Sequence, residues 1–344
     1  MKIFWRDETK QLVGEGALRC ERLSFSDLPR IDQLRESLSE GEYLFVVLGF
    51  DHSQRFPDLL LYQPKTLYST ANAMSAHLLA RTKTRCEQKI SKEKWRGLLQ
   101  EAFAAFRDTG LKKVVLGRQW HHHLEEELDF FAWYQALEQE DWAAKSRFSY
   151  ALDLGEGQAL MGFSPERLLS LRNDMLCCDA LAGTRETDHV FEDKEKQELR
   201  YVQTFLQEKL SRWGSPIASE LKRLELGYLS HLRQEFSMKV EQTVPLSELL
   251  CSLHPTPAVG GYPRDEARAF IALAEPEPRG WFTGTIGCVS KHEADFAVII
   301  RSAMLDQKRL SLFAGAGIVM GSDPDQEWEE TQLKMQPFLR LLSS

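Results

Sequence analysis

Hydrophobic residues recur with two different periods along the chain, which indicates a mixture of strands and helices. Over the first 90 residues, short apolar runs at 43–50 and 58–62 alternate with turn residues, a pattern typical of strands. After Ser91 the spacing becomes helical and predicts an amphipathic helix that Ser91 caps and Gly110 ends. Its predicted buried face consists of Trp95, Leu98, Leu99, Ala102, Phe103 and Phe106.

The rest of the chain continues this mixture of elements. Strands are expected at 113–116, 148–154, 160–163, 168–171 and 175–182. Helices are expected at 128–140, 193–213, 246–253 and 265–274, with a loop at 254–263. Residues 296–305 and 309–319 are expected to form a hairpin. A final helix should begin after Asp323, which is a favourable N-cap, with Pro324 in the first helical position.

No internal repeat, low-complexity run or Pro/Ser-rich linker divides the chain, so we expect one α+β domain over residues 1–344. No uninterrupted apolar segment reaches the ~18 residues of a membrane-spanning helix, so we expect no membrane association. The formal net charge of −8 argues against a nucleic-acid partner, because phosphate binding needs a clustered basic surface. A few local cations could still hold a small anionic substrate.

Cysteine and histidine positions do not predict a zinc site. The six cysteines form no Cys-x-x-Cys pair, and we expect them to be buried, reduced thiols of a cytoplasmic protein. Three consecutive histidines stand at 121–123, but consecutive residues of a strand point to alternating faces and rarely converge on one ion. We therefore expect a solvated strand end there.

Two predicted helices carry acidic pairs with a spacing of three residues. In the final helix, Glu327, Glu330 and Lys334 fall within a sector of about 60°. In the helix over 193–213, Glu195 and Glu198 form a second pair. If the pairs face each other, they offer the oxygen ligands that Mg²⁺ prefers. A solvated helix face is the alternative, and the sequence alone does not decide between the two.

Three other features are unusual within apolar strands. Gly315 and Gly317 weaken a strand and therefore indicate either the close approach of another group or a bend in the backbone. Arg301 is flanked by apolar residues and would need an anion if buried. Lys113 begins an apolar strand, and a desolvated lysine can act as a base near neutral pH. Each feature taken singly also has a purely structural explanation.

Taken together, ordered sequence blocks resemble the chorismate-utilising enzymes and, within them, the isochorismate synthases. The blocks are LKKVVLGR (111–118), GFSPERLLSL (162–171), ALAGT (180–184), KEKQELRYV (194–202), LHPTPAVGG (253–261), RGWFTGTIG (279–287), AVIIRSAML (297–305), FAGAGIV (313–319) and SDPDQEWEETQLK (322–334). They span a predicted catalytic core over 111–334, whereas residues 1–110 carry no recognisable motif. The resemblance implies an α+β fold of mostly antiparallel sheets flanked by helices.

The resemblance also implies roles for particular residues. Lys113 corresponds to the general base that activates water, and Glu166 to the general acid. The expected cofactor is Mg²⁺, held directly by Glu198 and Glu330, with Glu195 and Glu327 beside them. The expected substrate contacts are Gly183, Thr184, His254, Arg301, Gly315 and Lys334.

The implied reaction is the Mg²⁺-dependent, reversible hydration and isomerisation of chorismate to isochorismate. Lys113 together with Ala182 distinguishes this chain from the aminating relatives, so we expect no glutamine amidotransferase subunit. The 254–261 loop and Phe282 favour isochorismate as the accumulated product, and menaquinone biosynthesis is the preferred pathway. Leu199 and the segment 185–188 depart from common family residues. The alternatives are a salicylate synthase, which would go on to eliminate pyruvate, and a catalytically inactive relative.

Overall fold

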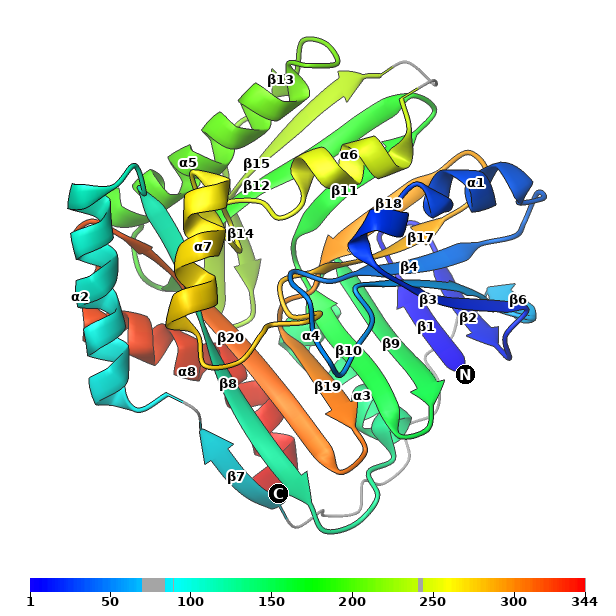
Figure 1. Cartoon of the computed structure of the whole chain (residues 1–344), viewed down its shortest axis with the longest axis horizontal. Coiled ribbons are helices and arrows are strands. Elements are labelled where there is room, and N and C mark those ends of the chain that lie inside the picture. The colour runs from blue at the N-terminus through cyan, green and yellow to red at the C-terminus, as the bar shows by residue number, and fades with distance from the viewer. Residues whose placement is uncertain (70–83, 89, 241–243, 344) are drawn as a thin grey trace.

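The molecule is built on two ten-stranded antiparallel sheets that stack face to face (Figure 1). The computed structural model describes residues 1–69, 84–88, 90–240 and 244–343. The first sheet runs in the order β16 (Gly261–Tyr262), β8 (Lys113–Leu124), β20 (Arg309–Val319), β19 (Ser302–Asp306), β10 (Gln158–Ser164), β9 (Phe148–Gly155), β1 (Lys2–Arg6), β2 (Gln11–Glu15) and β6 (Thr66–Ser69), and β7 (Thr84–Gln88) also pairs with β8.

The second sheet runs in the order β13 (Ile217–Ala218), β15 (Leu229–Lys239), β12 (Met175–Glu186), β11 (Arg167–Arg172), β18 (Ala294–Val298), β17 (Thr285–Val289), β4 (Leu44–Leu48), β5 (Leu59–Gln63) and β3 (Arg19–Leu23), and β14 (Lys222–Leu226) pairs with β15. The N-terminal region contributes to both sheets, because β1 pairs with β9 and β4 pairs with β17. Residues before 111 are therefore part of the same core as the motif-bearing residues.

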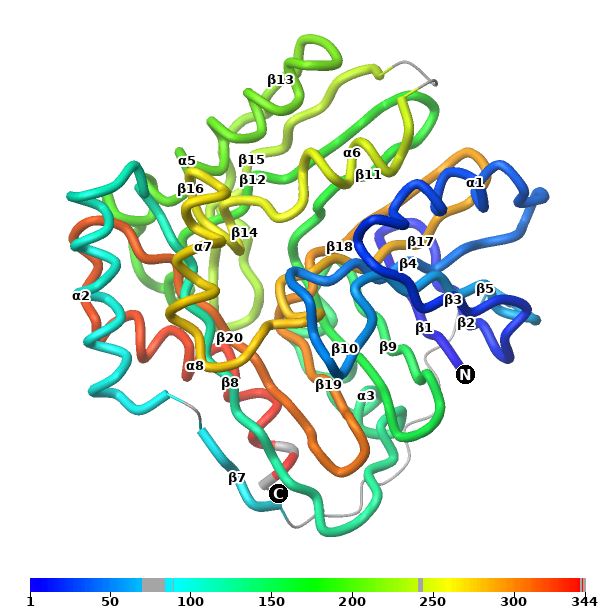
Figure 2. The backbone as a smooth tube through the Cα atoms, viewed as in Figure 1, coloured from blue at the N-terminus to red at the C-terminus, as the bar shows by residue number. Residues whose placement is uncertain are grey.

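Helices cover the outer faces of the sheets (Figures 1 and 2). The second sheet packs against α1 (Arg30–Ser37), α5 (Asp193–Leu210) and α6 (Leu246–Leu253). The first sheet packs against α3 (Phe130–Glu138), α4 (Asp141–Ala144) and α8 (Pro324–Ser343), and against α2 (Lys92–Asp108) and α7 (Arg264–Ala274) beside β8 and β20. A 3₁₀ turn, η1 (Phe25–Asp27), precedes α1. A third apolar cluster, which includes Trp5, Phe45, Tyr150 and Trp281, fills the space between the sheets.

Two neighbouring stretches of chain pass from one sheet to the other. One leads from β10 to β11 through 165–166, and the other leads from β18 to β19 through 299–301. The amide of Val298 donates to the Glu166 carbonyl oxygen at 3.0 Å, and the amide of Phe163 donates to the Arg301 carbonyl oxygen at 3.1 Å. Arg301 has a φ of 49°, a left-handed conformation that a non-glycine residue adopts only under constraint. These crossings place Glu166 and Arg301 at the junction of the two sheets.

The predicted α+β class and its antiparallel sheets are confirmed, and so are the two predicted helix starts. The Ser91 hydroxyl accepts a hydrogen bond from the Lys94 amide at 3.2 Å. The Asp323 carboxylate accepts bonds from the amides of Asp325 and Gln326, both at 2.9 Å. The helix expected to end at Gly110 instead ends with Thr109 as its C-cap. The structure contains no helix, within its described residues, that is long and apolar enough to span a membrane.

The hairpin predicted over 296–305 and 309–319 is only half correct. β19 and β20 do pair as an antiparallel hairpin, but the preceding apolar run breaks at 299–301, and its first part, β18, lies in the other sheet. An apolar run that is buried in both sheets gives no sign in the sequence of where it changes sheet. The strand predicted at 113–116 is likewise longer than expected, since β8 continues to Leu124.

The solvated strand end predicted for the three histidines is wrong for two of them. His121 and His122 are 2% and 5% exposed, and only His123 is exposed. β8 continues through this segment between β7 and β20, so neighbouring strands cover it. The Nδ1 atoms of His121 and His122 lie 2.9 Å from the Ser311 hydroxyl and 3.1 Å from the Thr84 hydroxyl. Hydrogen bonds within the sheet thus engage one nitrogen of each ring.

The cysteines are free thiols, but they are not all buried as predicted. Cys178 and Cys288 are buried, whereas Cys20, Cys86 and Cys251 are exposed. Cys20 lies on β3, the last strand of its sheet, and such a strand leaves side chains open to solvent.

Candidate active site

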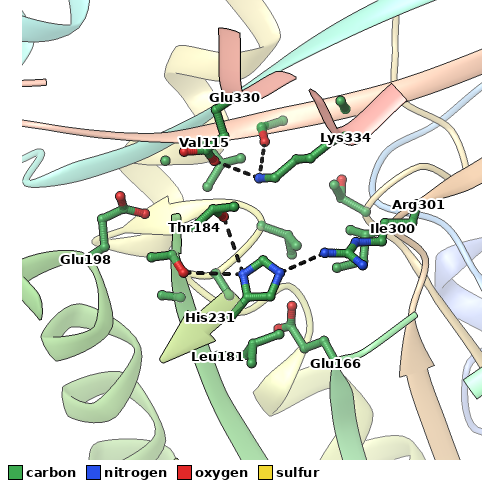
Figure 3. Close-up of a pocket in the computed structure, with 18 of the residues that line it drawn as sticks. Val115, Glu166, Leu181, Thr184, Glu198, His231, Ile300, Arg301, Glu330 and Lys334 are labelled. Carbon is green, nitrogen blue, oxygen red and sulfur yellow. Dashed lines mark hydrogen bonds and ion pairs between the residues drawn. The ribbon is translucent and has the colours of Figure 1, made fainter. Parts of the chain in front are cut away.

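A cavity lies where β8 and β20 of the first sheet approach α5, β12 and β15 of the second, beside α8 (Figure 3). Most of the residues predicted from the sequence line it. They are Glu166, Gly183, Thr184, Glu198, Arg301, Gly315, Glu330 and Lys334. These residues come from both crossings, from the two strands β12 and β20, and from the two helices α5 and α8, although they are far apart in the sequence. In Figure 3, the Glu330–Lys334 pair and Glu166 lie on opposite sides of His231.

The lysine predicted as a base lies directly behind this lining. Lys113 pairs with Tyr262 of β16 and Val319 of β20, and its side chain is 1% exposed. Burial lowers the pKa of Lys113 below its ordinary value, although the carboxylate of Glu198, whose Oε2 lies 3.7 Å from Nζ, acts in the opposite direction. A lysine with a lowered pKa is a better proton acceptor at neutral pH.

Gly317 explains how a helix side chain reaches this lysine. A Cβ at position 317 would overlap the Glu198 carboxylate and would lie 3.3 Å from Lys113 Cε. From the sequence alone, a glycine at this position indicates either a close approach or a bend. The close approach is confirmed at Gly317, because the missing side chain provides the space that Glu198 occupies.

The carboxyl predicted as the acid occupies the first crossing. Glu166 is 2% exposed, and burial raises its pKa to about 8, helped by the charge of Asp179 and opposed by Lys113. Its Oε1 accepts a hydrogen bond from the Thr256 hydroxyl at 3.5 Å. Glu166 therefore holds its proton at neutral pH and can donate it.

Arg301 and His231 form the polar wall between these groups. The Arg301 guanidinium donates to His231 Nε2 at 2.8 Å, while His231 Nδ1 lies 3.3 Å from the Gly183 carbonyl oxygen and 3.4 Å from the Thr184 hydroxyl. Burial, together with the charges of Arg301 and Lys334, lowers the pKa of His231 well below its ordinary value, so the imidazole is neutral. No carboxylate among the described residues pairs with Arg301, which leaves its charge directed at the cavity as an anion site.

The expected substrate contact of His254 is not supported by its position, and His231 was missed. His254 is absent from the cavity lining, and its Nε2 lies 3.0 Å from the Gly49 carbonyl oxygen. His231 stands opposite Thr184 in the β12–β15 pairing, and this partnership brings it into the site. The signal available in the sequence was a histidine between Ser230 and Leu232 in the run LSHL.

The two acidic pairs do face each other, because a single lysine, Lys194, contacts one carboxylate from each helix. Lys194 Nζ lies 2.8 Å from Glu198 Oε1 on α5 and 2.7 Å from Glu327 Oε1 on α8. Glu195, Glu198 and Glu327 are 1%, 5% and 2% exposed, so the alternative of a solvated helix face is wrong. Glu330 is held by Lys334 at 2.7 Å and lines the cavity.

These residues fit a magnesium ion in their donor chemistry. All four carboxylates supply the hard oxygen ligands that Mg²⁺ prefers, and Glu327 Oε2 is buried without a hydrogen-bond partner among the described residues. In the described part of the chain no three acidic, histidine or cysteine side chains converge on one point. The ammonium group of Lys194 stands between two of the carboxylates instead. Glu195 is held further back by Arg185, whose Nε lies 3.0 Å from Glu195 Oε1.

Comparison with known proteins agrees with the resemblance to the chorismate-utilising enzymes. Residues 28–343 match the family model described as chorismate binding enzyme. The chain belongs to this family. The match begins at residue 28, so it includes much of the region in which the sequence showed no recognisable motif.

Several isochorismate synthases are similar to this chain. The isochorismate synthase MenF of Haemophilus influenzae is 27% identical over 99% of this chain and 86% of its own length. The chloroplastic isochorismate synthase of Catharanthus roseus is 32% identical over 67% of this chain, which spans 42% of that plant protein.

Solved structures show the same fold. DhbC from Bacillus anthracis matches 99% of this chain and 96% of its own, with a TM-score of 0.84 at 24% identity. The menaquinone-specific isochorismate synthase MenF from Escherichia coli matches 99% of this chain and 88% of its own, with a TM-score of 0.80 at 25% identity.

Proposed function

We propose that this chain is an isochorismate synthase, an isomerase that converts chorismate reversibly to isochorismate. Water adds at C2 of the ring, the double bonds shift, and the C4 hydroxyl leaves, so that one water enters and one departs. The observation that carries the proposal is that two buried groups with opposite pKa shifts meet at one cavity, Glu166 in its lining and Lys113 directly behind it. Burial lowers the pKa of Lys113 and raises that of Glu166 to about 8.

Both shifts are in the direction of the charge states that the reaction requires, a neutral amine and a protonated carboxyl. Lys113 accepts a proton from the attacking water as the C2–O bond forms. Glu166 gives its proton to the C4 oxygen as the C4–O bond breaks, which turns a poor leaving group into water. The reverse reaction uses the same two groups with exchanged roles, in keeping with a reversible isomerisation. Neither step needs a nucleophile other than water.

The substrate carries two carboxylates, and the cavity offers two places for them. Arg301, with no carboxylate partner of its own among the described residues, would hold the enolpyruvyl carboxylate. The ring carboxylate would lie toward Glu198 and Glu330, where Mg²⁺, when bound, neutralises its charge. Lys334, which donates to the Gly315 carbonyl oxygen at 2.8 Å, adds a further positive charge on that side. Binding at both ends would hold the ring between base and acid.

The accumulated product is proposed to be isochorismate. The Phe282 ring stacks on Phe313 with centroids 5.0 Å apart, and both rings line the cavity. Phe282 has no hydroxyl with which to hold the enolpyruvyl group for hydrogen transfer from C2. Elimination of pyruvate would need such an arrangement, and it would give salicylate.

We further propose a cytoplasmic enzyme that works without an amidotransferase subunit, because Lys113 is suited to water as the nucleophile. The names of its relatives include menaquinone-specific and vibriobactin-specific synthases. We propose the menaquinone pathway, in line with the MenF relatives that cover most of the chain.

Chromatography of the products after incubation with chorismate and Mg²⁺ tests the proposal. We expect isochorismate in equilibrium with chorismate, and the same mixture when the reaction starts from isochorismate. A coupled assay for pyruvate, with salicylate fluorescence read in parallel, identifies the alternative. Stoichiometric pyruvate and salicylate would make this chain a salicylate synthase, and unchanged chorismate would indicate an inactive relative.

A further inference from the structure

Lys194 links the two acidic helices in this structure. It lies in the first turn of α5, and its Nζ contacts Glu198 Oε1 at 2.8 Å and Glu327 Oε1 at 2.7 Å. The side chain therefore places a fixed positive charge between carboxylates of α5 and α8.

The other cations around this cluster have different partners. Lys334 pairs with Glu330 one turn earlier on the same helix, and Arg185 pairs with Glu195. Lys113 approaches only Glu198, from the side of β8. Among the described residues of this cluster, Lys194 is thus the one cation that contacts carboxylates from both helices. A divalent ion bound by both helices would make the same connection.

The structure also provides a place into which this side chain can move. Lys194 is 20% exposed and lines a second cavity, which adjoins the first at Thr184 and Glu330. Glu186 and Glu329, both exposed, line the same cavity and offer carboxylates there. A lysine has a long, flexible stem, so a change of rotamer moves its ammonium group by several ångströms without moving the helix.

We propose that Lys194 is a resident counter-ion of the metal site, which holds the helices together in the absence of metal and is displaced when a divalent cation binds. This inference rests on the proposed Mg²⁺ dependence. It assigns Lys194 two effects of opposite sign: the residue stabilises the metal-free protein and weakens the binding of the metal. The unpartnered Oε2 of Glu327 supports this assignment, because a single ammonium leaves that oxygen without a ligand.

Removal of the Lys194 ammonium group tests the two effects, on the stability of the metal-free protein and on the binding of the metal, separately. Lys194→Met keeps the length of the apolar stem and deletes the charge, and Lys194→Gln is a second variant should the first fail to fold. Lys196→Met is the matched control, because Lys196 lies on the same helix, is half-exposed and contacts Asp193 at 3.6 Å. Each protein is stripped with EDTA, dialysed and titrated with Mg²⁺ by isothermal titration calorimetry.

We expect Lys194→Met to bind Mg²⁺ about tenfold or more tightly than the wild type, because no like charge has to be displaced. The metal-free variant should melt at a lower temperature than the wild type, and added Mg²⁺ should narrow or reverse that difference. Lys196→Met should match the wild type in both measurements. Equal or weaker Mg²⁺ binding by Lys194→Met would overturn the inference, since the lysine would then support the metal site.

The same titrations separate this inference from the proposed function. Absence of Mg²⁺ binding in the wild type and in both Lys194 variants would overturn the metal assignment and the inference together. Tighter binding by Lys194→Met, accompanied by no conversion of chorismate by the wild type, would support the inference and contradict the proposed function.

Discussion

The two ends of the cavity use the same residue type in opposite ways. At the end formed by α5 and α8, each of the four glutamates has a lysine or arginine nitrogen at 2.7 to 3.0 Å. At the sheet crossing, Glu166 has a hydroxyl partner, and no cation lies within ion-pair distance of it among the described residues. Burial therefore dominates at the crossing and raises the pKa of Glu166 to about 8. At the acidic end the outcome differs between residues: Lys334 and Lys194 outweigh burial at Glu330 and lower its pKa, whereas burial raises the pKa of Glu327 to about 8. The difference teaches that the surroundings of each glutamate, and not its residue type, decide whether its carboxyl group is charged and can hold a cation or keeps a proton that it can donate.

The largest expected effect follows from removing the base between the two ends. Lys113→Ala should lower turnover of chorismate by about 10² to 10⁴, because general-base catalysis contributes that much. Magnesium binding should persist, since the four carboxylates remain. Lys112→Ala, at the exposed neighbouring position, is the control and should keep wild-type turnover. Most of the wild-type rate in Lys113→Ala would remove this lysine from the mechanism.

The acidic end should be the more sensitive of the two to loss of a single charge. Glu198→Gln and Glu330→Gln should each weaken Mg²⁺ binding by at least the 10- to 100-fold that loss of an outer-shell partner costs. EDTA should inactivate the wild type, and added Mg²⁺ should restore it. Calorimetric titration and initial rates measure the two effects, and Glu101→Gln, at an exposed position on α2, is the control. Full activity in metal-free buffer would contradict the assignment.

The Glu166 carboxyl at the crossing should change how the free energy of unfolding depends on pH. The pKa of Glu166 is raised in the folded state from 4.5 to about 8, so its contribution is fully present below pH 4.5 and is lost as the pH rises toward 8. Over that range the wild type should lose stability relative to Glu166→Gln, on the order of a few kcal/mol. Urea unfolding of both proteins at pH 5 and pH 8 measures the difference, with Glu220→Gln as an exposed control. Parallel profiles would show that Glu166 is ionised in the folded protein.

The smallest expected effect is that of added ammonium ions, for which we expect no change. Ammonium ions should leave the products unchanged, because Lys113 and Glu166 are matched to the entry and departure of water. Mass spectrometry of reactions with and without ammonium chloride checks this expectation. Aminodeoxychorismate or anthranilate among the products would place the chain in an aminating branch of the family.

Local signals in the sequence predicted the helices better than the connections between strands. Ser91 and Asp323 mark helix starts through hydrogen bonds to amides only two or three residues away. The break in the apolar run at 299–301 depends on which sheet each half joins, and that choice is made by strands distant in the sequence. The left-handed backbone at Arg301 follows from this break, and nothing in the local sequence requires it.

Site residues could be predicted from the sequence where a residue type is unusual for the strand or helix in which it lies. A glycine in an apolar strand and a lysine at the head of another directed attention to Gly317 and Lys113, and both lie at the site. The choice of His254 over His231 shows the limit, because both histidines stand beside leucines and only strand register distinguishes them. The bridging position of Lys194 was also not visible, since it depends on α5 and α8 lying side by side.

The paired crossings also determine where the chain tolerates changes in length. Side chains of a strand alternate between two faces, so one residue inserted at 165–166 or 299–301 would exchange the inward and outward positions of the strand that follows. Apolar side chains of β11 or β19 would then be turned toward the wrong layer, and Glu166 or Arg301 would leave the cavity. Natural insertions and engineered tags should therefore be confined to surface turns such as 155–157, far from the junction of the sheets.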